Sequence, residues 1–164
     1  MRVDLRELMV NPGSRLPFRL ELDTGDLMFP SIREYRRPPV AKGVFYNEAG
    51  ILHLRGTISA EMRCICDRCG QEYDRVKLTD VDTVLLEEES EESPDCFVLD
   101  GTELDLQEVL SACLILDMET KFLCREDCRG LCARCGRNLN LGPCGCGKEI
   151  DPRFAVLEQL LDKA

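Results

Sequence analysis

The chain has 164 residues, of which 44% are hydrophobic and 32% charged, and a formal net charge of −10. This composition is typical of a soluble globular protein, and we expect one domain over residues 1–164. No apolar run approaches the roughly 20 residues that cross a bilayer, and residues 1–18 lack the apolar stretch of a signal peptide. We therefore expect a cytoplasmic protein without a membrane partner or a small-molecule substrate. The acidic balance also argues against diffuse attraction to a phosphate backbone.

The first half of the chain has the pattern of a sheet. Residues 15–29 alternate well enough to predict a strand that ends in a turn near Gly25. Residues 31–43 carry basic side chains and two prolines, which indicates a basic loop or sheet edge, either solvated or in contact with RNA. From 40 to 86, period-2 alternation predicts an antiparallel β-meander. His53 lies on its polar side, so we interpret it as a surface strand residue and not as a catalyst.

The second half begins with an acidic segment, residues 87–95, which we interpret as a solvated loop, with docking of a basic ribosomal protein as the alternative. Asp105 can cap a helix with an apolar stripe that includes Cys113, and Asp151 can cap a last helix. The predicted fold class is α+β, an antiparallel meander with one packed helix, a zinc-bound loop region and a short C-terminal helix. The predicted sub-regions are a β-rich region over residues 1–100, a helix in 101–123, zinc-binding loops over 124–150 and a C-terminal helix over 151–164.

Eleven cysteines in a cytosolic chain indicate metal binding more than disulfides, because thiols stay reduced in the cytosol. Two segments have the form Cys-x-Arg-Cys-Gly, at 66–70 and at 132–136. Two intervening residues let both sulfurs reach one zinc ion at about 2.3 Å, and the glycine permits a positive φ. The spacing predicts two structural zinc ions, with these ligands: Cys66, Cys69, Cys124 and Cys128 for one, and Cys132, Cys135, Cys144 and Cys146 for the other.

Spacing alone leaves other interpretations of the cysteines open. Cys64 could replace one of the predicted ligands, or a single zinc could leave spare thiols. A thiol redox protein or sensor using Cys66 and Cys69 is an alternative function, although redox pairs normally open a helix in an alternating βα pattern. Hydrolytic zinc chemistry is disfavoured, because catalytic zinc keeps an open water position and usually has histidine ligands. We therefore expect no enzyme activity.

The pattern as a whole resembles the YceD family, the bacterial and plastid proteins associated with accumulation of large-subunit ribosomal RNA. The resemblance is carried by the CDRC that ends a strand, the acidic loop, DLQEVL, LCREDCRGLCARCGRNLN, CGC and DPRFAVLEQLL. It extends from about residue 40 to 161 and is most specific over 124–161. It implies a non-enzymatic factor in the synthesis, processing or stability of 23S-type ribosomal RNA.

The partners expected from this resemblance are a ribosomal RNA precursor, a ribosomal protein or a large-subunit assembly intermediate. Basic side chains near the cysteines are candidates for phosphate contacts, and compensation of thiolate charge is the alternative role. These candidate nucleic-acid-binding residues are Arg125, Arg129, Arg134, Arg137 and Lys148.

Overall fold

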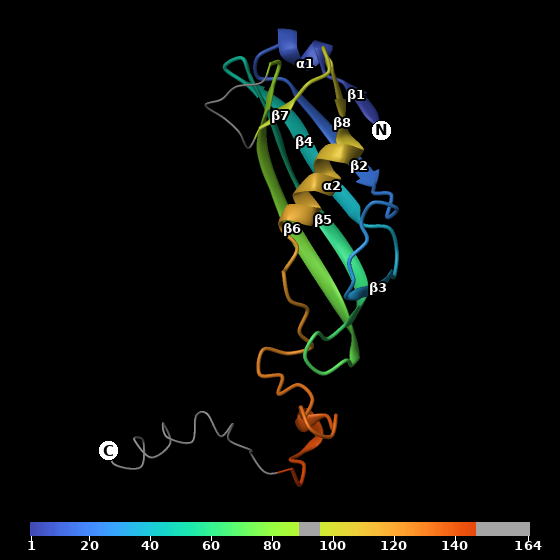
Figure 1. Ribbon diagram of the computed structural model, residues 1–164. Coiled ribbons are helices and arrows are strands. Elements are labelled where there is room, and N and C mark those ends of the chain that lie inside the picture. The colour runs from blue at the N-terminus through green and yellow to red at the C-terminus, as the bar shows by residue number, and fades with distance from the viewer. Residues whose placement is uncertain (89–95, 147–164) are drawn as a thin grey trace, which may run out of the picture.

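The computed structural model describes residues 1–88 and 96–146, and its fold is α+β, as predicted. The main sheet has the strand order β2-β4-β5-β6-β7, and β3 pairs with β5 beyond the end of β4 (Figure 1). All pairs are antiparallel except β6 with β7, which the predicted meander did not include. The strands are β2 (Arg15–Glu21), β3 (Ile32–Tyr35), β4 (Val40–Glu48), β5 (Ile51–Ile65), β6 (Glu72–Leu86) and β7 (Phe97–Val98).

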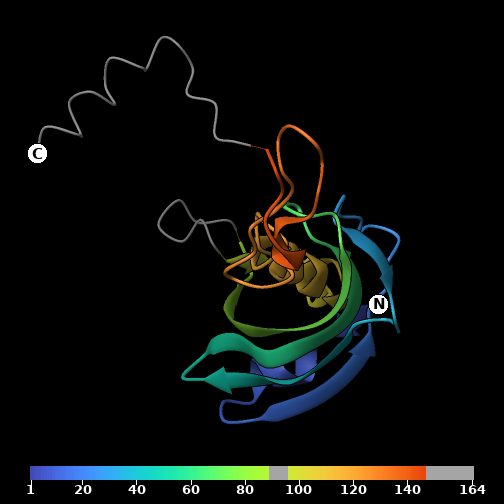
Figure 2. The same cartoon turned by 90° about the horizontal axis from the view of Figure 1, so that it is seen from below.

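The core lies between the inner face of the sheet and α2 (Leu106–Leu116), and Figure 2 shows the sheet curving around this helix. Alternate residues of β5 are buried because neighbouring side chains on a strand point to opposite faces. Asp105 caps α2 as predicted and accepts backbone hydrogen bonds from Gln107 and Glu108. Cys113 is half-buried and packs against the core, so its assignment to the apolar stripe is confirmed. The inward β5 side chains are Leu52, Leu54, Ile58, Ala60, Met62 and Cys64.

A pair of glycines brings β4 and β5 close together on the inner face. Gly43 is directly opposite Gly56, and a Cβ on Gly43 would lie 2.8 Å from the Gly56 Cα and 2.8 Å from Cε1 of Phe18. Because real Cβ atoms essentially never approach so closely, only glycine fits at this position. The Phe18 ring lies over Gly43 and packs 5.2 Å from the Phe45 ring, centroid to centroid.

The N-terminus forms elements that no sequence pattern predicted. β1 (Arg2–Asp4) pairs with β8 (Glu103–Asp105) in a separate two-stranded sheet, and α1 (Arg6–Val10) follows β1. The Met1 amine lies 3.1 Å from Oδ1 of Asp105, the residue that caps α2. The first residues of the chain are therefore tied to the start of the packed helix.

After α2 the chain runs to the end of the β5–β6 hairpin that lies opposite α1, and the cysteine-rich segment lies there (Figure 1). This segment contains one 3-10 helix, η1 (Leu139–Leu141). The C-terminal helix predicted for 151–164 falls outside the described residues, as does most of the acidic loop. Among the described helices, none is long and apolar enough to span a membrane.

Candidate metal centres

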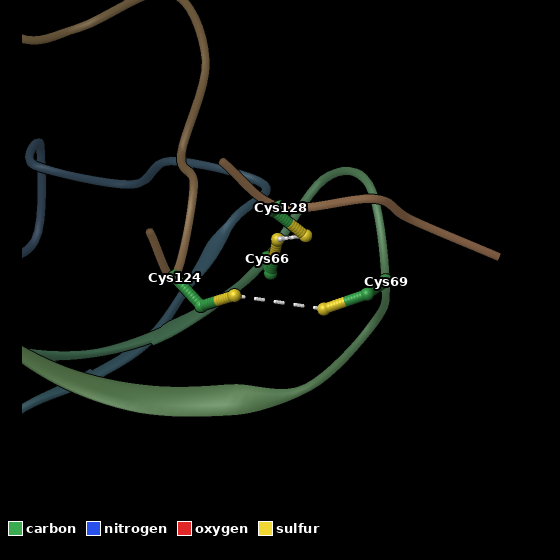
Figure 3. A group of neighbouring side chains, drawn as sticks. All are labelled: Cys66, Cys69, Cys124 and Cys128. Carbon is green, nitrogen blue, oxygen red and sulfur yellow. Dashed lines mark hydrogen bonds between the residues drawn. The ribbon is translucent and has the colours of Figure 1, made fainter. Parts of the chain in front are cut away.

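The first cysteine group joins the β5–β6 turn to the segment after α2. Its members are Cys66, Cys69, Cys124 and Cys128, whose sulfur atoms all lie within 4.8 Å of one another (Figure 3). The Cys66 and Cys128 sulfurs are 3.7 Å apart, and so are those of Cys69 and Cys124. Cys66 is only 1% exposed. The group therefore forms a closed sulfur cluster between two distant stretches of the sequence.

These separations fit a tetrahedral metal. Four sulfurs held about 2.3 Å from one zinc ion at tetrahedral angles lie roughly 3.8 Å from each other. The observed 3.7 Å between sulfurs of different segments matches that edge length. A disulfide would instead need about 2.05 Å, and all the cysteines are free thiols. The donor set of this group can hold a thiophilic metal ion.

The backbone around Cys66 forms a tight turn that two backbone hydrogen bonds close. Cys66 donates its N–H to the Gln71 carbonyl at 2.9 Å, and Gly70 donates to the Cys66 carbonyl at 2.8 Å. Gly70 has a φ of 68°, a left-handed conformation that favours glycine. The Cys-x-Arg-Cys-Gly motif therefore produces the turn that its spacing predicted.

The second motif repeats this turn in the C-terminal segment. Cys132 donates its N–H to the Arg137 carbonyl at 2.8 Å, Gly136 donates to the Cys132 carbonyl at 2.9 Å, and Gly136 has a φ of 70°. Both motifs therefore form the same pair of backbone hydrogen bonds. The second group is more exposed than the first, and its sulfurs also lie within 4.8 Å of one another; its members are Cys132, Cys135, Cys144 and Cys146.

Ionisation of the thiols is unequal within each group. Burial opposes ionisation of Cys66, yet backbone N–H groups of Cys124 and Cys69 point at its sulfur and lower its pKa to about 6. Burial and the neighbouring thiol of Cys69 raise the pKa of Cys124 to about 12. Four adjacent thiolates repel one another, so a full set of anionic ligands requires a cation at the centre.

The second group shows the same division. Backbone N–H groups of Cys135 and Arg134 lower the pKa of Cys132 to about 6. The neighbouring Cys135 thiol raises the pKa of Cys146 to about 12. Each group therefore contains at least one thiol whose pKa is lowered and one whose pKa is raised.

Two residues between Cys66 and Cys69 attach the first group to the rest of the chain. Asp67 donates its N–H to the Phe122 carbonyl at 2.8 Å and accepts the Phe122 N–H at 2.6 Å through Oδ2. Arg68 donates from Nη1 to the Cys128 carbonyl at 3.0 Å and accepts the Leu131 N–H at 3.1 Å. The turn between Cys66 and Cys69 therefore holds in place the segment that leads into the second cysteine turn.

Asn140 of η1 links the loop of the second group to the first group. Its Nδ2 donates to the Cys128 sulfur at 3.3 Å, and its Oδ1 accepts the Arg129 N–H at 2.8 Å. The hydrogen bond from Asn140 lowers the pKa of Cys128. A side chain from the loop between Cys135 and Cys144 therefore stabilises the thiolate form of a first-group sulfur.

The three remaining cysteines lie outside both groups. Cys64 is fully buried on the inner face of β5, where burial raises the pKa of its thiol, and burial likewise raises the pKa of Cys113 on α2. Cys96 is half-buried next to β7. The alternative in which Cys64 replaces a ligand therefore has no support from the arrangement.

The predicted nucleic-acid contacts are distributed over both groups, with Arg125 and Arg129 beside first-group cysteines and Arg134 and Arg137 beside second-group ones. Arg125 lies 3.4 Å from Asp127, whereas Arg129 and Arg137 are exposed and make no ion pair within the described residues. Arg134 is also exposed, and Lys148 lies outside the described residues.

Asp67, Arg68 and Asn140 were not among the residues predicted from the sequence. The arginine is shared by both Cys-x-Arg-Cys motifs, which is a weak signal for a role in docking. The aspartate occurs only in the first motif, and the asparagine lies in a short polar loop. Their contacts join residues 11 to 60 positions apart, so local spacing could not reveal them.

The fold and these groups define an α+β protein with two candidate metal centres made only of cysteine. Residues 54–161 match the model of the family described as Large ribosomal RNA subunit accumulation protein YceD. The chain belongs to this family, as its resemblance predicted.

Similar curated proteins come from mycobacteria and a plant. An uncharacterized protein of Mycobacterium leprae is 38% identical over 64 residues, 39% of this chain and 29% of that protein. One of Mycobacterium tuberculosis H37Rv is 32% identical over 118 residues, 68% of this chain and 56% of that protein. The chloroplastic YCED homolog 1 of Arabidopsis thaliana, named a large ribosomal RNA subunit accumulation protein, is 25% identical over 130 residues, 60% of this chain and 40% of that protein. The chain thus spans between 29% and 56% of these relatives. No solved structure matches it.

Proposed function

We propose that the chain is a non-enzymatic factor that supports the synthesis, processing or stability of 23S-type ribosomal RNA. Membership of the YceD family carries this proposal, together with the name of the Arabidopsis relative. The working partner is a ribosomal RNA precursor, a ribosomal protein or a large-subunit assembly intermediate. The place of action is the cytoplasm.

The proposal for the metal is that each cysteine group holds one structural zinc ion. The tetrahedral spacing of the first group and the repeated turn of the second support it. Zinc accepts four thiolates without redox chemistry and stabilises the folded chain by binding ligands that the unfolded chain does not preorganise. Elemental analysis of the purified protein should give about two zinc ions per chain; zinc below one per chain would contradict this proposal.

The redox alternative at Cys66 and Cys69 has less support. Both side chains are buried, and each sulfur contacts the sulfur of a cysteine from the segment after α2. A thiol that exchanges disulfides needs access to its partner. Titration of thiols in the native protein distinguishes the two roles, since a zinc-bound group reacts slowly until a chelator is added. Docking of a basic ribosomal protein by the acidic loop stays a separate prediction.

Depletion in cells tests the role in ribosomal RNA. In a bacterium that lacks its own family member, expression of this chain should restore the ratio of 23S to 16S ribosomal RNA. Cys66→Ser/Cys128→Ser should fail to restore it, because both changes remove ligands of the first group. Cys113→Ser, which alters a thiol outside both groups, serves as the matched control. An unchanged 23S to 16S ratio in cells without any family member would refute the proposed role.

A further inference from the structure

The outer face of the sheet carries a basic hollow at a distance in sequence from the cysteines. Arg19 of β2 lies opposite Lys42 of β4, and Lys42 lies opposite Thr57 of β5, so the three side chains form one row across three strands. A hollow of about 310 Å³ opens over this row. Its lining residues are Arg19, Arg37, Val40, Lys42, Thr57, Ser59 and Glu61.

The charge of the hollow is positive in a chain whose net charge is −10. Glu61 is neutralised by Arg37, whose Nη2 lies 2.7 Å from its Oε1. Arg19 and Lys42 are exposed and make no ion pair within the described residues. Two cations therefore remain without an acidic partner, beside the Ser59 hydroxyl, which can donate a hydrogen bond to an anion. The Thr57 hydroxyl donates instead to Oδ1 of Asp80 on β6 at 3.3 Å.

On β5 and β6, by contrast, the cations of the same outer face form ion pairs. Arg55 lies 2.7 Å from Asp82, and Arg63 lies 2.9 Å from Asp74, so these arginines have acidic partners. Ion pairing across strands is thus the common arrangement of cations on this face. Arg19 and Lys42 depart from it, which leaves their charge available for a ligand.

An aromatic surface lies further along the same strands. Tyr46 and His53 stack with ring centroids 4.7 Å apart and planes at 8°, and the Arg55 guanidinium lies 5.9 Å from the Tyr46 centroid. Tyr46 follows Lys42 by four residues, so the two side chains share a face about 13 Å apart along β4. Basic grooves next to aromatic rings are the pattern by which proteins hold single-stranded nucleic acid.

We propose that this hollow binds phosphate groups of single-stranded RNA, with Arg19 and Lys42 as the phosphate contacts. The inference rests on the proposed function for the nature of the ligand. It places an RNA contact on the sheet, apart from the arginines of the cysteine-rich segment. Ser59 supplies a neutral hydrogen bond, and the Tyr46–His53 pair offers a ring surface to a neighbouring base.

The test measures the affinity for a fluorescent 12-nucleotide single-stranded RNA by anisotropy across a range of salt concentrations. Arg19→Gln/Lys42→Gln removes two phosphate contacts, each contributing about 0.7 to the slope of log K against log salt on a single strand. The slope should fall by about 1.4, and binding at 0.1 M salt should weaken about 25-fold if the curves converge at 1 M. Arg19→Lys/Lys42→Arg should retain the wild-type affinity.

Two further variants make the outcome specific. Arg2→Gln/Arg6→Gln removes the same net charge outside the hollow and should leave the affinity nearly unchanged. Arg129→Gln/Arg137→Gln tests the cysteine-rich segment. Loss of affinity only in this last variant, equal loss in all charge-removing variants, or no RNA binding by the wild type would each overturn the inference. Tighter binding to an acidic peptide than to RNA would also overturn it. The 23S to 16S assay stands apart from these measurements, so the proposed function can survive their failure.

Discussion

The Asn140 side chain offers a test of how the two cysteine groups depend on each other. Asn140→Asp keeps the oxygen that accepts the Arg129 N–H but removes the N–H that lies 3.3 Å from the Cys128 sulfur. Asn140→Ala removes both contacts. The pair of variants therefore separates the hydrogen bond to sulfur from the bond that positions η1.

The expected effect is weaker zinc binding at the first group. Loss of a hydrogen bond to a metal ligand typically lowers metal affinity by about 10- to 100-fold. With zinc in excess, the same factor lowers the metal-linked free energy of unfolding by about 1.4 to 2.7 kcal/mol. Asn140→Asp should have the larger effect of the two, because its carboxylate also places a negative charge beside a thiolate.

Competition with chelators of graded affinity measures this effect. The zinc held by the first group should leave at lower chelator concentration in both variants, with the total still about two per chain before chelation. Cys113→Ser provides a baseline, since its sulfur lies outside both groups. If zinc retention in Asn140→Asp equals that of the unaltered protein, the hydrogen bond has no role in metal binding and the reasoning is wrong.

Three more predictions concern the cysteine turns and the sheet. Cys135→Ser should reduce the zinc content by about one ion and speed amide exchange around the second turn, and full zinc content would contradict its role as a ligand. Gly43→Ala should lower the free energy of unfolding by about 1 to 3 kcal/mol in urea, because its Cβ would collide with the backbone of Arg55 and Gly56. Gly25→Ala, where the nearest atom is 3.6 Å away, is the control. Asp67→Ala should cost about 1 to 3 kcal/mol, because it leaves a backbone N–H bound at 2.6 Å without its acceptor, and an unchanged denaturation midpoint would contradict this.

Much of the sheet could be predicted because its main strands are long and place their apolar side chains mostly on one face. β5 has 15 residues, and from Leu52 to Cys64 its apolar side chains all lie on one face, interrupted by Gly56 at the close approach to β4. By contrast, β1 and β8 have 3 residues each, too few for a period to emerge. β7 has only 2 residues, and no local pattern specifies its parallel pairing with β6.

Part of the candidate site could likewise be predicted from the sequence, and part could not. The spacing predicted the two groups of four cysteines that the structure brings together, because each Cys-x-Arg-Cys turn supplies two sulfurs at a fixed separation, but it left a role for Cys64 open. It could not predict that Asn140 would approach Cys128, or that Arg19 would lie opposite Lys42. Those contacts depend on the docking of η1 and on the strand register, and both are properties of the assembled fold.

The two groups close loops of very different length. Cys66 and Cys128 are 62 positions apart, whereas Cys132 and Cys146 are 14 apart. The free-energy cost of closing a loop of n residues grows as 1.5 RT ln n, apart from a common constant. This cost is roughly 3.7 kcal/mol for the long loop and about 2.3 kcal/mol for the short one. The short loop also contains all its ligands, so it can capture metal in a chain whose sheet has not yet formed. The long loop requires β5, β6 and α2 to bring its halves together. With a metal ion in each group, as proposed, the C-terminal group can therefore fill without the sheet, whereas the group at the sheet requires the folded domain.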